Sequence, residues 1–176
     1  RIFACLRQHH ERRSDTQNVR RIGPTVLRMI EQAPFYNDLD LSLAEAKALI
    51  ADGAYDRKRS AHHPVVATIG CDGSPSQRVM ILRAVDWERR LLRFHTDYRT
   101  TKVEELCQRN LASVLIYEPD AKIQLRLAGT ATVHTEGAVV DSAWDEATLF
   151  ARRCYLAEQS PGKISPEPVS GLPADV

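Results

Sequence analysis

Four basic side chains lie close together in residues 77–102, and their spacing suggests a site for an anion. They are Arg78, Arg83, Arg99 and Lys102. The stretch reads as two strands that lead into a helix start. Because the start of a helix offers free backbone N–H groups and the positive end of the helix dipole, it favours a bound anion. Together with the cationic side chains, it predicts a phosphate site.

The expected helix start carries its own signals. Thr101 is followed three residues later by Glu104, which fits a capping box, and Val103 and Leu106 give the helix an apolar side. Lys102 should therefore lie in the first helical turn, next to the free N–H groups.

These residues carry a resemblance to a known family. The strand motif Arg-Val-Met-Ile-Leu-Arg at 78–83, the pair His95 and Thr96, and the pair Thr101 and Lys102 are similar to motifs of the pyridoxamine phosphate oxidase family, the FMN-binding split barrels. The resemblance covers roughly residues 35–165. It implies that FMN is the cofactor and that these residues bind it: Arg78, Val79, Met80, Ile81, Leu82, Arg83, His95, Thr96, Thr101, Lys102, Gln124, Gln159 and Ser160.

The resemblance also implies separate roles for these residues. Arg78, Thr101 and Lys102 would hold the phosphate, while Gln124 and the strand at 78–83 would position the ring. Arg83 would orient an anionic substrate. The pair Gln159 and Ser160 would reach the flavin across the interface of a homodimer, whose two chains share the cofactor site.

One spacing needs an irregular backbone. Arg78 and Arg83 are five residues apart, so in a regular strand their side chains point to opposite faces. One cofactor could contact both only through twist, a backbone contact or a bulge.

The chain departs from the family pattern where the substrate would bind. Arg83 stands where the family has Lys, His95 where it has Tyr, and Thr148 where it has Arg. The final Trp and Arg-x-His segment of the family has no counterpart before Val176. The leading hypothesis is an FMN-dependent oxidoreductase that transfers a hydride from a small-molecule substrate to FMN and is reoxidised by dioxygen. The alternative is a flavin- or haem-binding split-barrel module without pyridoxamine phosphate oxidase activity.

Hydrophobic periodicity predicts a mainly β chain. A helix is expected at 43–53, with Ser42 as its N-cap. Strands are expected at 64–70, 76–85, 91–96, 111–117 and 122–134, the first three as a hairpin and meander, followed by a mostly helical segment at 139–156. Short strands with hairpin turns favour an antiparallel β-barrel with flanking α-helices.

The composition excludes several classes of partner. The 24 Lys and Arg against 23 Asp and Glu give a net charge near zero, which offers no general attraction for nucleic acid or an anionic membrane. No apolar run approaches the length of a membrane-spanning helix. The four cysteines form no Cys-x-x-Cys pair, so we expect free thiols, a cytoplasmic location and no metal site. His62 and His63 should lie in a solvated loop.

We divide the chain into three parts. Residues 1–33 form an Arg-rich N-terminal extension, 34–165 the FMN-binding domain, and 166–176 an incomplete Pro-rich C-terminal loop. The Arg-rich start leaves two other interpretations open, a targeting presequence or a nucleic-acid arm.

Overall fold

The fold is built on one antiparallel sheet of seven strands. The computed structural model describes residues 33–173 and, for the backbone alone, residues 2–8. The order across the sheet is β3-β2-β6-β7-β1-β5-β4, and every neighbouring pair is antiparallel. The strands are β1 (Ile2–Gln8), β2 (Val65–Ile69), β3 (Pro75–Val79), β4 (Leu82–Asp86), β5 (Leu91–Thr96), β6 (Leu111–Glu118) and β7 (Ile123–His134).

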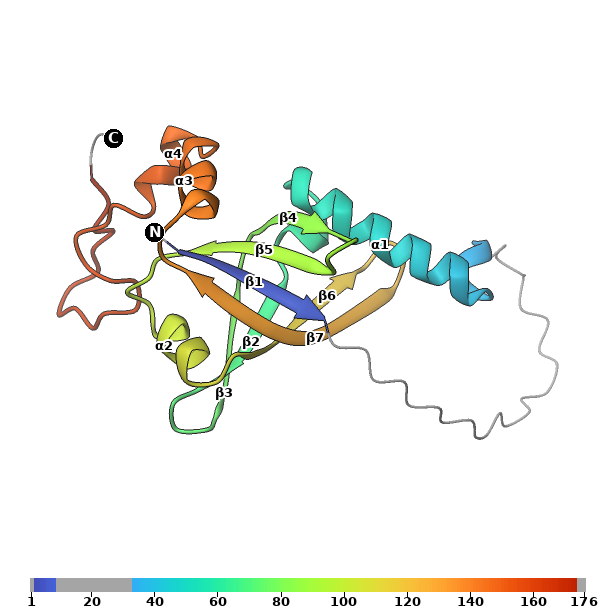
Figure 1. Ribbon diagram of the computed structural model, residues 1–176, viewed down its shortest axis with the longest axis horizontal. Coiled ribbons are helices and arrows are strands. Elements are labelled where there is room, and N and C mark those ends of the chain that lie inside the picture. Colours follow the sequence, from blue (N-terminus) through green and yellow to red (C-terminus); the bar gives the residue numbers. More distant parts are fainter. Residues whose placement is uncertain (1, 9–32, 174–176) are drawn as a thin grey trace.

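The sheet is rolled but not closed. Its two edge strands, β3 and β4, follow each other in the chain and are separated only by Met80 and Ile81. A link of two residues keeps the two edges close, so the sheet must curve, yet no β3–β4 ladder forms among the described residues. The predicted mainly β fold with flanking helices is confirmed, as a split and open barrel (Figure 1).

The single strand predicted at 76–85 is wrong. The chain leaves β3 at Val79, and β4 pairs with β5 at the opposite edge of the sheet order. Strands β2, β3, β4 and β5 therefore do not form a continuous meander. A register shift between Leu82 and Ala84 places a bulge at Arg83. Because Arg78 and Arg83 belong to different strands, the alternation within a single strand does not determine the faces to which their side chains point.

Strand β1 differs from the expectation that residues 1–33 lie outside the domain. Its backbone pairs with β5 on one side, Phe3 opposite His95, and with β7 on the other, Ala4 opposite Val133. Residues 2–8 are therefore part of the sheet. The rest of the predicted extension, residues 9–32, lies outside the described residues.

The helices flank the sheet at its two ends (Figure 1). They are η1 (Pro34–Tyr36), α1 (Leu39–Tyr55), η2 (Ser60–His62), α2 (Thr101–Gln108), α3 (Ala138–Asp145) and α4 (Leu149–Arg153). Helix α1 is longer than predicted and is capped by Asp38, whose carboxylate accepts from Leu41 N at 2.9 Å; Ser42 lies inside the helix. Within the described chain, no helix combines the length and apolar character needed to cross a bilayer.

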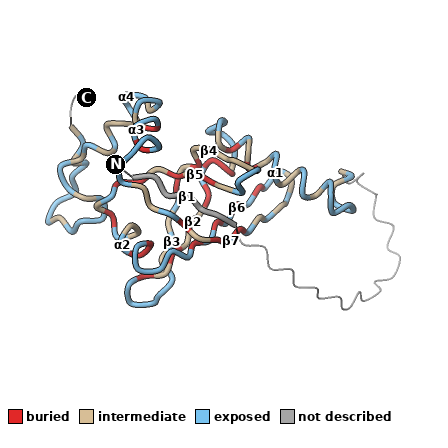
Figure 2. Tube along the Cα trace, in the orientation of Figure 1, coloured by how far each residue is buried: buried red, intermediate tan, exposed pale blue. Residues whose placement is uncertain are grey.

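The core follows the alternation of the strands. In β6 the side chains of Ala112, Val114 and Ile116 are buried, while their neighbours Leu115 and Tyr117 face outward. Figure 2 shows buried residues spread through the strands of the sheet. His62, predicted to be solvated, is buried, and its Nδ1 lies 2.7 Å from the carbonyl oxygen of Gly53. That contact holds η2 against α1.

Candidate functional site

Arg78 lies at the centre of a polar network on the inner side of the sheet. It comes from β3, where Ser76 and Arg78 point inward and Gln77 and Val79 outward. Its guanidinium donates to Glu105 Oε2 at 2.8 Å and also to the hydroxyls of Thr68 and Ser76. Three elements, β2, β3 and α2, are joined by these contacts.

Glu105 completes this network as an ionised carboxylate. It is 5% exposed and accepts from Ser76 Oγ at 2.9 Å and from Thr68 Oγ1. Burial alone would raise the pKa of Glu105, but the hydrogen bonds from Thr68, Ser76 and Arg78 outweigh burial and lower it. The charge of Arg78 is therefore paired inside the protein.

Lys102 lies in the first turn of α2, as predicted. Its Nζ donates to Thr96 Oγ1 at 3.1 Å, and burial, followed by the nearby charge of Arg78, lowers the pKa of Lys102. The predicted capping box at Thr101 is wrong. The N-cap is Thr100, whose hydroxyl donates to the carbonyl of Asp97 at 2.8 Å, while Thr101 is the first helical residue and is exposed.

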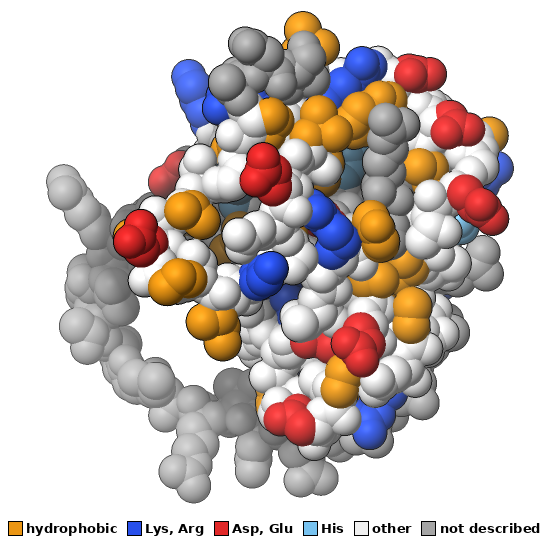
Figure 3. All heavy atoms as spheres, turned by 90° about the vertical axis from the view of Figure 1, so that its left-hand side faces the viewer, with side chains coloured by type: hydrophobic (Ala, Val, Ile, Leu, Met, Phe, Trp, Pro, Cys, Tyr) orange, Lys and Arg blue, Asp and Glu red, His pale blue; other side chains and the backbone are white. Residues whose placement is uncertain are grey.

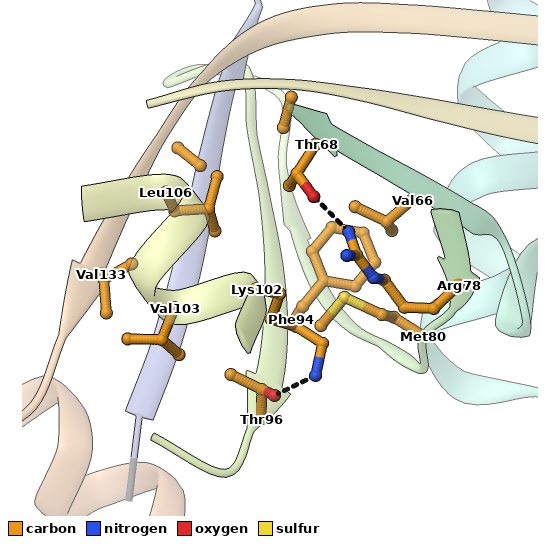
Figure 4. A pocket seen from close by; sticks show the side chains of 12 residues that line it. Val66, Thr68, Arg78, Met80, Phe94, Thr96, Lys102, Val103, Leu106 and Val133 are labelled. Atoms are coloured by element: carbon orange, nitrogen blue, oxygen red, sulfur yellow. Dashed lines mark hydrogen bonds between the residues drawn. The ribbon is translucent and has the colours of Figure 1, made fainter. Parts of the chain in front are cut away.

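Arg78 and Lys102 line one small cavity (Figure 4). Its volume is about 20 Å³, room for about one water molecule, and its other walls are mostly apolar, with Phe94 and Met80 between the two cations. We call Arg78, Thr96, Thr101 and Lys102, with the start of α2, the basic cradle. The structure brings these four predicted residues to one region.

Arg83 and His95 lie on the other face of the sheet. Arg93 and His95 alternate with the buried Leu92, Phe94 and Thr96 along β5 and point outward. Burial, together with the charges of Arg83 and Arg93, lowers the pKa of His95 to about 3, so the imidazole is neutral near pH 7. Arg83 is thus separated from the basic cradle by the sheet.

The segment that contains α3 and α4 contacts Arg83 and Arg93 on the outer face of the sheet. Glu146 lies 3.6 Å from a terminal nitrogen of Arg93. Burial raises the pKa of Tyr155, while a hydrogen bond and the charge of Arg83 oppose this shift. The Nε atoms of Arg83 and Arg93 are buried and make no hydrogen bond within the described residues.

Arg99 does not join the basic cradle. It pairs with Asp97 at 2.7 Å, and hydrogen bonding from Arg99, with burial in opposition, lowers the pKa of that carboxyl. Arg99 also donates to the carbonyls of Ala157 at 2.8 Å and Glu158 at 3.2 Å. These contacts hold the C-terminal loop just before Gln159 and Ser160, so the predicted pair lies beside the turn that precedes α2.

The remaining predicted residues are dispersed. Met80 and Leu82 are buried in the core, Ile81 is half-buried between the two edge strands, and Val79 is exposed. Gln124 is exposed on the outer face of β7, directly across from Tyr117 of β6. One chain therefore does not bring Gln124 to the basic cradle.

The sequence reasoning missed the partners of Arg78. Glu105 follows Lys102 by three residues and so shares its helix face, a signal that could have placed both on the inner wall. Thr68 and Ser76 are directly opposite each other in the β2–β3 hairpin, and Arg78 lies opposite Val66. These partners of Arg78 could be identified only from the register of the β2–β3 hairpin, which the sequence does not give. Arg93 and Tyr155 were also missed, because each depends on the packing of α3 and α4.

The surface at the α2, α3 and α4 end has mixed charge. Figure 3 views the molecule from this end and shows Lys and Arg side chains near the middle of the face, with acidic side chains around them. Basic and acidic side chains are thus interspersed on this face, in agreement with the net charge of +1.

A rolled, open antiparallel sheet with flanking helices and a basic cradle at a helix start defines the class of FMN-binding split barrels. A family model, described as pyridoxamine 5'-phosphate oxidase, FMN-binding domain, matches residues 44–135. The chain belongs to this family.

Two curated relatives carry the oxidase name. A pyridoxine/pyridoxamine 5'-phosphate oxidase from Burkholderia vietnamiensis is 39% identical over 64 residues, 36% of this chain and 29% of the relative. Pyridoxine/pyridoxamine 5'-phosphate oxidase 2 from Arabidopsis thaliana is 28% identical over 122 residues, 60% of this chain and 62% of the relative. The chain thus spans less than two thirds of either relative.

Two solved structures share the fold. A pyridoxamine 5'-phosphate oxidase-related, FMN-binding protein from Nostoc punctiforme superposes with a TM-score of 0.57 at 25% identity, covering 69% of this chain and 65% of its own. PhzG from Burkholderia lata, solved with tetrahydrophenazine-1-carboxylic acid, gives a TM-score of 0.59 at 25% identity, covering 76% and 66%.

Proposed function

We propose that this protein binds FMN and that the basic cradle holds the FMN phosphate. The observation that carries this proposal is the meeting of Arg78, Lys102 and the start of α2 on one wall of an FMN-binding family domain. Cationic donors and free helix N–H groups are the chemistry that a phosphate requires.

The donors fit a phosphate, although the inner cavity is too small to contain one. Three of the five N–H donors of Arg78 serve Thr68, Ser76 and Glu105, which leaves two. Lys102 has a single hydrogen-bond partner, Thr96, among the described residues. Thr101 is exposed beside it. The phosphate would therefore lie at the rim of the cavity, next to Thr101 and Lys102.

The proposed activity is oxidation of a small anionic substrate. Bound FMN would supply hydride acceptance and reoxidation by dioxygen. Arg83 would orient the anionic group of the substrate, as the resemblance to the family implies, because its guanidinium carries a permanent positive charge. The neutral His95 beside Arg83 would present a ring without adding charge. PhzG, which was solved with a carboxylic acid, supports an anionic substrate.

A homodimer would complete the site. Gln124 is exposed away from the basic cradle, and Gln159 and Ser160 follow the loop tied by Arg99. A second chain would bring such residues to the ring of an FMN held by the first. The exposed free thiols of Cys71, Cys107 and Cys154 support the further proposal of a reducing, cytoplasmic location.

Titration with FMN tests the cofactor proposal. Lys102→Ala should weaken FMN binding at least tenfold, because it removes a charge-assisted hydrogen bond to the phosphate. Riboflavin, which lacks the phosphate, should bind equally to both proteins. The matched control is Lys58→Ala, an exposed lysine remote from the cradle, which should bind FMN as the parent does. Equal FMN affinity for the parent and Lys102→Ala would contradict the proposal.

An assay for peroxide separates the enzyme from the binding module. Addition of pyridoxamine 5'-phosphate to the FMN-loaded protein should release peroxide if the substrate is turned over. A specific observation favours the alternative without turnover: Thr148, where the family has Arg, caps α4 by accepting from Ala151 N at 3.3 Å. Stable FMN binding without peroxide release would support a binding module without oxidase activity. A Soret band in the absorbance spectrum would indicate haem as the bound group.

A further inference from the structure

A second concave site lies at the other end of the sheet from α2. It is a groove of about 540 Å³ between α1, the first half of β7 and the turn that joins β4 to β5. In Figure 1 these elements lie together at the right, whereas α2 lies at the left. The volume falls within the range typical of small-molecule sites.

The groove lies beside the part of β7 for which no pairing with β1 is described. Pairing of β1 with β7 ends at Gln8 opposite Gly129, so within the described residues 123–128 pair with β6 alone. Helix α1 crosses this region, and its Leu43, Ala46 and Ile50 face Leu125 and Leu127 of β7 across the groove. Trp87, from the turn, closes one side. The walls are therefore mainly apolar.

The charges around the groove all have one sign. Lys47, Arg90 and Arg126 line it, and no Asp or Glu does so within the described residues. Arg90 has a left-handed backbone (φ 53°) at the end of the turn, where its amide bonds the carbonyl of Trp87 at 3.4 Å. Arg126 points outward from β7. Three cations around an apolar surface favour a ligand with an apolar body and an anionic group.

We propose that this groove binds a small amphipathic organic anion, with its hydrocarbon or aromatic body against Trp87 and Leu127 and its anionic group toward Arg90 and Arg126. The proposal goes beyond FMN binding and does not depend on it. A basic peptide is disfavoured by the charge of the groove. FMN is itself an amphipathic anion, and Gln124 lines the groove, so the experiment must separate the two sites.

Calorimetric titration with decanoate tests the site directly. Decanoate should bind saturably with one molecule per chain, and decanamide, which has the same body and no charge, should bind about tenfold more weakly. Binding that does not saturate, or equal affinity for the two compounds, would overturn the proposal.

Variants at the rim locate the binding. The double variant Arg90→Gln, Arg126→Gln keeps side-chain length and removes two charges, and should weaken decanoate binding about tenfold. The matched control is Arg89→Gln, in the same turn but outside the groove, where Arg89 lies 3.7 Å from Asp86. The control should bind decanoate as the parent does. The same loss in the control would show that general charge, rather than this groove, drives binding.

Competition with FMN decides whether the groove is a separate site. Saturating FMN should leave the decanoate affinity unchanged, and Lys102→Ala should bind decanoate as the parent does even where it no longer binds FMN. Competitive displacement of decanoate by FMN would overturn the second site and place the groove within the flavin site. Failure of the FMN proposal alone would leave decanoate binding intact.

Discussion

Glu105 is a buried carboxylate next to two cations that we propose for phosphate binding. Its side chain is 7% exposed, against 19% for its partner Arg78, and their atoms lie 2.8 Å apart. Removal of one partner of such a pair leaves the other charge buried without compensation. The pair is therefore expected to stabilise the folded state and to fix Arg78 in place.

Replacement of Glu105 by Gln should destabilise the protein by about 2 kcal/mol. The amide keeps the shape and some hydrogen bonds but no longer neutralises Arg78, so the loss should be smaller than that of a fully broken buried pair. Urea denaturation measures the change. Glu104→Gln, an exposed neighbour in the same helix turn, should change stability by less than about 1 kcal/mol. Equal effects of the two variants would mean that the buried network contributes little.

His95 should make stability depend on pH below neutrality. Burial lowers the pKa of His95 to about 3, whereas in the unfolded chain a histidine titrates near 6.5. Above about pH 6.5 both states are neutral and pH has no effect through this group. As the pH falls from about 6.5 toward 3, the unfolded state binds a proton that the folded state does not, so the free energy of unfolding decreases. The slope is below about 1.4 kcal/mol per pH unit, because the ring is partly exposed.

The free energy of unfolding, measured by denaturation at pH 7.5, 6.5 and 5.5 for the parent and for His95→Tyr, isolates this effect. All three pH values lie above the ordinary pKa of carboxyl groups (~4), so carboxyl titration contributes little. The tyrosine variant should lose most of the slope between pH 6.5 and 5.5. His63→Asn, at an exposed histidine, should keep it. An unchanged slope in His95→Tyr would show that another group causes the pH dependence.

At the scale of elements, close contact between α1 and η2 requires a glycine. A Cβ added to Gly53 would lie 2.5 Å from Ala61 Cβ and 2.6 Å from its carbonyl carbon. Real Cβ contacts do not reach these distances, so the helix would have to move away from η2. The hydrogen-bonding distance between His62 Nδ1 and the Gly53 carbonyl would be lost with that movement.

Gly53→Ala should therefore lower stability by about 1 to 3 kcal/mol, although alanine is the better helix former by about 1 kcal/mol. Thermal unfolding checks the sign. Ala48→Gly, at an exposed position of the same helix, should cost up to about 1 kcal/mol through helix propensity alone. A higher melting temperature for Gly53→Ala would mean that η2 moves freely relative to α1.

The sequence predicted element types better than it predicted their ends or partners. Alternation found the strand at 122–134, because one buried face imposes period two. The start of α1 was misplaced because Asp38 and Ser42 are both good N-caps and only tertiary structure selects Asp38. The break at Met80 and Ile81 escaped detection because both are apolar residues in an apolar run. Arg78 and Lys102 could be assigned to a phosphate site by motif, whereas Glu105, Thr68 and Tyr155 depend on long-range packing.

At the scale of the whole molecule, the outer face of the sheet carries exposed apolar side chains on β3 and β6. Val79, Leu111 and Tyr117 are 61%, 52% and 57% exposed. The register places Val79, Val65 and Leu115 in one row across β3, β2 and β6, and Tyr117 directly across from Gln124. Exposed apolar side chains grouped in this way are typical of an interaction surface. We propose that it is the homodimer interface, because Gln124 would then enter the partner's flavin site.

Tyr117→Glu should convert the proposed dimer to single chains and weaken FMN binding at the same time, because the new charge would be buried in the interface without a partner. Sedimentation velocity at micromolar concentration reports the assembly state, and FMN titration of the same samples reports the site. Tyr55→Glu, at a tyrosine 88% exposed on the far end of α1, makes the same chemical change away from the interface and should leave both properties unchanged. If Tyr117→Glu sediments as the parent does, the interface lies elsewhere. If it becomes a single chain and still binds FMN as tightly, the flavin site is complete within one chain and Gln124 has no part in it.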